Sequence, residues 1–419
     1  MTSDGADRVA FYVAHEFHRA ILEPVYEELR QKFPALITQN VEQIFAFEPR
    51  VLVLSDAHAF LFRRRLPETA IIWTRHGFSN KKNIGPSIAG CDFACLSSEW
   101  VRSDFEHRGL RPRLGVWITG FVLMDPVLYG PRPQRSEAPT MLFAPTWNPS
   151  LSAAPIVAKE TFEQICSELP ELRVLIKPHP VTPDRNPEWM EAWRSIARRH
   201  PKVRLIEDSH QNIYDLIGEA DVLVSDVSSV IFYFLALDRP IILVDVPKGQ
   251  LDPSVVDPAA PEWMWRDVGL RVDSPADLFS AVKRCLTHPE EKADVRAEYR
   301  RRVFGEGLKS RASTLIAQNI SRLLRPAPEE QKLAEITWNA IRTLGAYEGR
   351  VSEMEELARK RDEALRIQIT MLENKLRDRQ EAYNTLVDSL PLRLSRSIER
   401  YPLVKRSLKA VMNKIVPPK

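Results

Sequence analysis

Short β-rich apolar runs alternate with stretches of helical periodicity along most of this chain. The expected strands of the first part are residues 9–13, 50–54, 70–74, 92–96 and 114–118. Residues 17–32 form an expected helix with Ile21, Val25 and Leu29 on one face. Such alternation is typical of parallel sheets, in which a helix connects each strand to the next. The pattern predicts a Rossmann-like α/β domain over residues 1–130.

A second alternation of the same kind follows a proline-rich stretch. Residues 129–139 contain three prolines and a glycine and almost no apolar side chain, so 131–139 is the expected linker. The strands expected beyond it are residues 140–144, 172–176, 203–206, 220–225 and 240–245, and the helices 157–168, 187–199, 211–218, 229–237, 275–287 and 308–324. Residues 140–326 are therefore predicted to form a second Rossmann-like domain. Two such domains enclose a cleft between their strand ends.

The composition changes after residue 326. From about 330 to 388 there is no proline, charges are dense, and apolar residues recur mostly three or four positions apart. Residues 327–388 are predicted to form a long helix able to pair as a coiled coil, with one irregularity near Arg361. A single helix that folds back on the body is the alternative.

The last segment, residues 389–419, is strongly basic. It carries eight basic side chains against one acidic side chain, whereas the whole chain has a net charge of only +3. Its apolar residues share one helical face, the pattern of an amphipathic helix on an anionic membrane surface, and Pro402 would kink it. A solvated basic face, or one packed on an acidic part of the body, is the alternative. Because the basicity is confined to this tail, nucleic-acid binding by the body is not expected.

Targeting and cysteine patterns restrict the protein class. No apolar run approaches the ~20 residues that cross a bilayer, and no basic and apolar leader opens the sequence, so a cytoplasmic location is expected. The four cysteines, Cys91, Cys95, Cys166 and Cys285, show neither a CxxC pair nor zinc spacing. Buried reduced thiols and no metal site are expected.

Polar motifs follow four of the expected strands. They are Arg75–Gly77, Ala144–Trp147, Lys177–Pro180 and Asp226–Ser229. Ligands of open α/β folds bind beyond the carboxyl ends of the strands, so these loops are the candidate site. His76 could accept a proton from an attacking hydroxyl because its pKa lies near working pH. His179, held between two prolines, suits a fixed contact with a phosphate.

Two helix entries are candidate phosphate sites. Ser228 and Ser229 precede an apolar helix, where unpaired N–H groups and hydroxyls favour an anion, although plain N-capping is the alternative. Gly305 and Gly307 precede a second helix and allow close backbone approach, with Lys309, Ser310 or Arg311 in reach of a diphosphate. The chain has neither a P-loop nor GxGxxG, which argues against ATP hydrolysis and NAD chemistry.

The motifs, taken in order, resemble those of CDP-glycerol glycerophosphotransferases, the teichoic-acid and capsule polymerases and primases of glycosyltransferase-B (GT-B) architecture. The resemblance covers about residues 8–325 and rests on Arg75–Gly77 with Lys81 and Lys82, Gly120 with Asp125, Ala144–Trp147, Lys177–Pro180, Asp226–Ser229 with Arg239–Ile242, and the helix after Gly307. It implies two Rossmann-like GT-B domains, an N-terminal acceptor domain and a C-terminal donor-nucleotide domain, followed by the helical region and the tail.

The resemblance also implies residue roles. His76 is the implied general base and His179 the support of the transferred or leaving phosphate. The implied donor-binding residues are Pro145, Thr146, Trp147, Lys177, Asp226, Ser228, Ser229, Gly307, Lys309 and Ser310. No metal or other cofactor is expected, because helix dipoles and cationic side chains can stabilise a diphosphate leaving group. The sequence departs from the family pattern at Phe78, Ser79 and Asn148 and between Gly120 and Asp125, which leaves the transferred group and the acceptor open.

The implied activity is transfer of glycerol phosphate, or a related polyol phosphate, from a CDP-activated donor to a hydroxyl of a cell-surface glycan or lipid-linked acceptor, with release of CMP. A GT-B glycosyltransferase that uses a nucleotide sugar in envelope or capsule polysaccharide synthesis is one alternative. A non-enzymatic membrane-associated scaffold is another. The expected partners are the donor, the acceptor, a second copy of the chain through the helical region, and the inner face of the plasma membrane through the tail.

Overall fold

The structure is a computed structural model, and it describes residues 7–75, 77, 78, 84–130, 137–155, 157, 159–208, 211, 213–245, 260–305, 310–399 and 406. The chain divides into two compact units, residues 1–348 and residues 349–419. The first unit contains both predicted Rossmann-like domains. The second contains most of one long helix.

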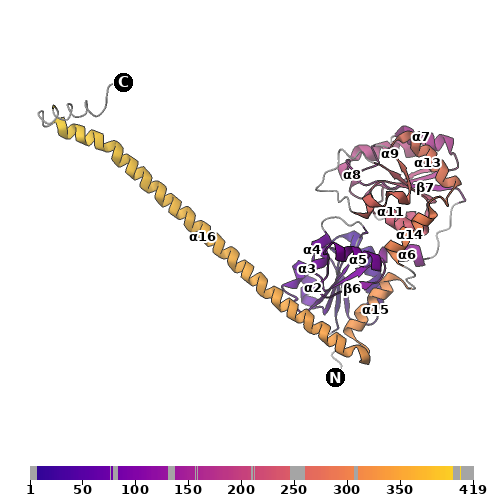
Figure 1. The fold of residues 1–419 in the computed structure, drawn as a ribbon, viewed down its shortest axis with the longest axis horizontal. Coiled ribbons are helices and arrows are strands. Elements are labelled where there is room, and N and C mark those ends of the chain that lie inside the picture. Colours follow the sequence, from indigo (N-terminus) through magenta and orange to yellow (C-terminus); the bar gives the residue numbers. More distant parts are fainter. Residues whose placement is uncertain are drawn as a thin grey trace. The chain divides into compact units, whose positions relative to one another are not determined.

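The first domain is built on a parallel sheet of six strands in the order β2-β1-β3-β4-β5-β6. The strands are β1 (Val9–Tyr12), β2 (Ala35–Thr38), β3 (Val51–Leu54), β4 (Ala70–Thr74), β5 (Phe93–Leu96) and β6 (Gly115–Ile118). β3 and β4 are buried at every residue, because helices cover both faces of a parallel sheet. The helices are α1 (Arg19–Leu29), α2 (Val41–Phe47), α3 (Ala59–Arg63), α4 (Ile84–Ala89), α5 (Glu99–His107) and α6 (Asp125–Tyr129) (Figure 1).

The second domain repeats this plan with six parallel strands in the order β12-β11-β10-β7-β8-β9. The strands are β7 (Thr140–Phe143), β8 (Arg173–Ile176), β9 (Val203–Leu205), β10 (Val222–Ser225), β11 (Ile241–Val244) and β12 (Leu270–Val272). The helices are α7 (Lys159–Glu168), α8 (Thr182–Arg185), α9 (Pro187–Arg199), α10 (Ile213–Glu219), α11 (Val230–Phe234), α12 (Pro261–Met264), α13 (Pro275–Thr287) and α14 (Ala293–Phe304). The predicted fold class, two Rossmann-like domains with a long C-terminal helix, is confirmed.

Helix α15 (Ala312–Leu324) differs from the expectation that it belongs to the second domain. It packs along α1 of the first domain instead. The Asp125 carboxylate accepts hydrogen bonds from the backbone N–H groups of Ala312 and Ser313 at 2.7 and 2.9 Å, and so satisfies the first turn of the helix. The chain therefore returns to the first domain before α16 begins.

Helix α16 (Gln331–Glu399) is one continuous helix of 69 residues. It continues past residue 388, so the first part of the predicted basic tail belongs to this helix; of residues 400–419, Arg406 alone lies within the described residues. The start of α16 packs against the first domain through Trp338, whose Nε1 donates to the Leu323 carbonyl at 3.0 Å. The Arg50 guanidinium lies 4.2 Å from the centre of the indole ring.

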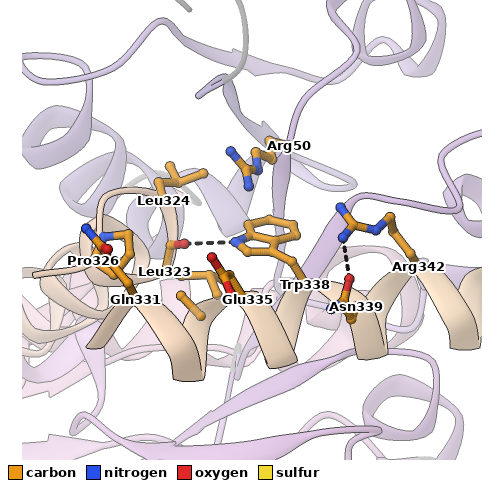
Figure 2. A pocket seen from close by; sticks show the side chains of 10 residues that line it. Arg50, Leu323, Leu324, Pro326, Gln331, Glu335, Trp338, Asn339 and Arg342 are labelled. Carbon is orange, nitrogen blue, oxygen red and sulfur yellow. Dashed lines mark hydrogen bonds between the residues drawn. The ribbon is translucent and has the colours of Figure 1, made fainter. Parts of the chain in front are cut away.

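A cavity of about 440 Å³ lies beside this contact, lined by Arg50, Trp338, Gln331, Glu335 and Arg342 among others (Figure 2). Arg50 directly precedes β3, so the cavity is at the amino-terminal edge of the first sheet. The motif loops follow the carboxyl ends of the strands. The cavity therefore belongs to the attachment of α16 rather than to the predicted site.

The described part of α16 beyond residue 348 has exposed apolar side chains along its length, including Met354, Leu365, Leu372 and Leu376. No helix within the described ranges is both long enough and apolar enough to cross a membrane. Cys91, Cys95 and Cys285 are buried and all four cysteines are free, as expected. Burial raises the pKa of the Cys91 and Cys95 thiols to about 12.

Candidate functional site

Three motif loops meet where the strand order of the second sheet reverses. β7 pairs with both β10 and β8, so the loop after β7, which contains Pro145, Thr146 and Trp147, lies between the loops that begin at Asp226 and Lys177. Such a reversal is the point at which open α/β sheets bind ligands. The fold therefore brings three of the four predicted motifs to one edge.

Asp226 is buried at this edge and organises the loop after β7. Its carboxylate accepts backbone hydrogen bonds from Thr146 at 2.9 Å, Ala153 at 2.8 Å and Val227 at 2.7 Å. Burial raises the pKa of the Asp226 carboxyl to about 6, although these amides and the Arg266 guanidinium oppose the shift. The contacts make Asp226 a positioning residue for the Thr146 loop. A direct contact with the donor stays a prediction.

Ser228 and Ser229 lie half-buried at the start of α11. Ser228 Oγ accepts from the Val230 N–H at 3.4 Å, a long contact, and the Ser229 side chain makes no capping bond to the helix. N-capping therefore accounts for little of this motif. Its hydroxyls remain suited to a polar ligand.

The Lys177 and His179 loop follows β8 at the same edge. Lys177 is buried and its Nζ donates to the Asp208 carbonyl at 3.0 Å, and burial lowers the pKa of this amine. His179 is half-buried, and its Nδ1 faces the Val181 N–H at 3.4 Å. Asn186 Nδ2 donates to the Trp147 carbonyl at 2.7 Å, which ties this loop to the loop after β7.

His76 itself lies outside the described residues, as do Gly307 and Lys309. The described residues Arg75 and Phe78, on either side of His76 in the sequence, make defined contacts. The buried Arg75 guanidinium donates to the Phe78 carbonyl at 2.7 Å, and the Phe78 N–H donates to the Tyr233 hydroxyl of α11 at 3.2 Å. The Phe78 and Phe232 rings lie 4.6 Å apart. Phe78, two residues after His76 in the sequence, thus contacts α11, the helix that Ser228 and Ser229 precede.

Of the second predicted phosphate site, Gly305, Ser310 and Arg311 lie within the described residues. Gly305 and Ser310 line a small cavity of about 130 Å³ together with Asp125 and Arg300. Burial raises the pKa of the Asp125 carboxyl, whose oxygens bind the start of α15. The structure does not bring Ser310 into contact with the motifs after β7, β8 and β10.

Two residues that sequence reasoning missed hold the site together. Tyr233 accepts from Phe78, and Arg266 donates to the Asp226 main-chain carbonyl and pairs with Asp245 at 2.7 Å. Tyr233 lies in an apolar run that reads as core, and its partner is 155 positions away. Only the fold could reveal these contacts.

Comparison with known proteins assigns the domain that holds most of these motifs. Residues 132–321 match the family described as CDP-Glycerol:Poly(glycerophosphate) glycerophosphotransferase. The match spans a little under half of the chain. The resemblance inferred from the motifs is confirmed for this domain, which is similar to the glycerophosphotransferases.

Solved structures agree on the fold. The wall teichoic acid polymerase TagF aligns with a TM-score of 0.59 at 13% identity, over 77% of this chain and 91% of TagF. A TagF variant soaked with CDPG aligns with a TM-score of 0.57 at 14% identity, over 77% and 90% of the two chains. UDP-GlcNAc 2-epimerase from Neisseria meningitidis bound to UDP-GlcNAc aligns with a TM-score of 0.53 at 12% identity, over 76% and 100%. No curated protein sequence matches this chain.

Proposed function

We propose that the protein transfers glycerol phosphate, or a related polyol phosphate, from a CDP-activated donor to a hydroxyl of a cell-surface glycan or lipid-linked acceptor. The observation that carries the proposal is the hydrogen bond from the Phe78 N–H to the Tyr233 hydroxyl, within the fold of a glycerophosphotransferase. It fastens the loop of the proposed base to the helix that begins beside the proposed phosphate site. A group transfer between two bound substrates requires such proximity.

In the proposed reaction, His76 removes the proton from the acceptor hydroxyl. The oxygen attacks the β-phosphorus of the donor, a new phosphodiester bond forms, and the bond between this phosphorus and the CMP oxygen breaks. His179 and Lys177 would stabilise charge on the phosphates from the loop after β8. Ser228 and Ser229 would donate to them from the loop after β10, and the loop around Thr146 would contact the donor.

The donor assignment has independent support from a relative. TagF, which shares the fold, was soaked with CDPG. No described group of His, Cys, Asp and Glu residues has the spacing of a metal site. We propose that cationic side chains and N–H groups carry the phosphate charge without a further cofactor, and that a chelator leaves the rate unchanged.

A donor panel tests this function. Purified protein is mixed with a crude membrane acceptor and with CDP-polyols and nucleotide sugars, and products are read by mass spectrometry. We expect CMP from a CDP-polyol only. His76→Ala and His179→Ala should lower the rate by roughly 10² to 10⁴, the usual share of proton transfer and electrostatic stabilisation, whereas the exposed His288→Ala should have no effect.

Other outcomes separate the alternatives. Release of UDP, GDP or CDP from a nucleotide sugar would make the protein a GT-B glycosyltransferase. If no donor in the panel releases a nucleotide, and His76→Ala has no effect in cells, the scaffold alternative would be favoured. For the tail we propose attachment to the inner membrane face, and flotation with anionic but not neutral vesicles, lost on deletion of residues 400–419, is the expected result.

A further inference from the structure

The first sheet has its own reversal of strand order, and the proposed mechanism does not use it. β1 pairs with β2 on one side and β3 on the other, so the chain changes direction between β1 and β3. The loops that follow these two strands hold His15, Phe17 and His18 on one side and Asp56 and His58 on the other. The crevice at such a point is where open α/β sheets bind ligands.

Aromatic and imidazole rings gather at this edge of the sheet. The His15 and Phe17 rings are parallel, with 5.5 Å between centroids and 4° between planes. The His18 ring is fully buried and lies 5.4 Å from His15. The His58 ring lies 6.5 Å from His15 and 5.7 Å from Tyr12. His15 is exposed and Phe17 is 61% exposed, whereas His18 is buried. The two parallel rings are therefore accessible from solvent.

Phe17 exposes a large apolar ring to water although this ring stacks on His15. Such exposure of an ordered ring requires an explanation. Burying Phe17 against an apolar surface would be favourable, because it removes apolar area from water. The negative faces of aromatic rings attract positively polarised C–H groups, which line one side of sugar rings and polyol chains. Imidazole nitrogens can both donate to and accept from hydroxyl groups. The cluster therefore suits a hydroxyl-rich carbon skeleton.

The local charge disfavours an anionic ligand. Glu16 accepts hydrogen bonds from Arg19 and Gln39, both at 2.6 Å, so the nearby cation is already paired. Asp56 adds a second carboxylate, which binds the Ala57 N–H at 2.7 Å. Both carboxylates would repel an anionic ligand.

The ring cluster follows strands that lie near β4, and β4 precedes the proposed base in the sequence. β3 separates β1 from β4, and strand spacing of ~4.8 Å puts the ends of β1 and β4 roughly 10 Å apart. Ser55 Oγ and Thr74 Oγ1 are 3.1 Å apart, which ties the end of β3 to the end of β4. Arg75 and His76 follow Thr74 directly.

We propose that His15, Phe17 and His58 form the acceptor subsite, and that it binds an uncharged, hydroxyl-rich unit such as a sugar or polyol residue. The designation as acceptor rests on the proposed function. Binding of the hydroxyl-rich unit does not. Phe17 supplies the stacking face, and the two histidines supply hydrogen bonds at its edge.

Saturation-transfer NMR tests binding without turnover. The probes are methyl glucoside, methyl N-acetylglucosaminide and glycerol, with full-length protein and no donor. We expect signal transfer to the carbon-bound protons of at least one probe, and a loss of at least fivefold in Phe17→Ala. Phe17→Trp should retain it, because the ring face is kept. Tyr347→Ala, which removes another exposed aromatic ring, should behave as wild type.

Circular dichroism establishes that each variant is folded, and the Trp variant guards against a folding defect in Phe17→Ala. No transfer to any probe by the wild type would overturn the subsite, as would equal transfer in Phe17→Ala. Binding that depends on Phe17, without CMP release from any CDP-polyol, would leave the subsite standing and refute the proposed function. If both the subsite and the proposed function are correct, Phe17→Ala should raise the acceptor KM at least tenfold and leave the donor KM unchanged.

Discussion

Asp226 is placed by its motif beside the donor, yet its carboxylate is fully occupied by three backbone amides of the surrounding loops. The cause is burial: an ionised carboxylate with no access to water must find donors, and the loop after β7 provides them. Under the proposed function, Asp226 would therefore act on the donor through the shape of the Thr146 loop. The sequence motif indicates this residue, and the fold shows which groups its carboxylate binds.

The raised pKa of Asp226 gives a prediction for stability. Its folded-state pKa of about 6 lies above the usual 3.8, so the folded state holds this proton more tightly than the unfolded state. Its contribution is fully present below about pH 4 and is lost as the pH rises through 6. Between pH 4.5 and 7 the wild type should therefore lose about 2 kcal/mol of unfolding free energy relative to Asp226→Asn, which does not titrate. Urea unfolding at both pH values measures this, and a constant difference between the two proteins would contradict it.

The residues of the candidate site differ in whether the sequence alone could predict them. Lys177, His179, Ser228 and Ser229 are found at one sheet edge because motif position and strand alternation are both local patterns. Tyr233 was unpredictable, because its hydroxyl meets Phe78 only after two domains have folded and packed. The sequence indicated Asp125 only as part of a motif. Its hydrogen bond with the start of α15 depends on the position of this helix, which is far away in the sequence.

At the scale of elements, Gly345 sets how closely α16 approaches the first domain. A Cβ there would lie 1.9 Å from the Pro67 carbonyl oxygen, whereas a Cβ at Gly349 would meet nothing. Gly345→Ala should therefore push the start of α16 away and destabilise the protein by about 1–3 kcal/mol. Gly349→Ala, the matched control, should stabilise the helix by up to about 1 kcal/mol. Chemical unfolding and hydrogen exchange over residues 331–348 measure both, and equal effects would refute this account of the packing.

Elements were predictable where their pattern was strong. Central strands such as β3 and β4 have uniformly apolar sequences and were expected within a residue of their observed bounds. The edge strands β2 and β12 were missed, because edge positions are partly exposed and three or four residues give little periodicity. Helix α15 was expected by range but not by location, since amphipathic spacing says which face is buried and not which domain buries it.

At the scale of the whole molecule, the long helix predicts association. Leu365, Ile369, Leu372 and Leu376 recur at intervals of four and three on α16 and are all at least 46% exposed. Such a stripe matches the seam of a coiled coil, and a second copy is the expected partner. Sedimentation velocity should show a dimer or higher oligomer. Leu372→Glu should shift it toward monomer, while the neighbouring Met371→Glu, which lies off the stripe, should not. A monomeric wild type would refute self-association.

The fate of the donor's β-phosphorus tests the central claim most directly. CDP-glycerol labelled with ³²P at this position is incubated with the protein and a membrane acceptor, and products are separated from nucleotides. Attack at phosphorus predicts that the label moves into an acceptor phosphodiester while unlabelled CMP is released. Label that leaves in CDP would show attack at carbon and would contradict the assignment of this protein as a polyol-phosphate transferase.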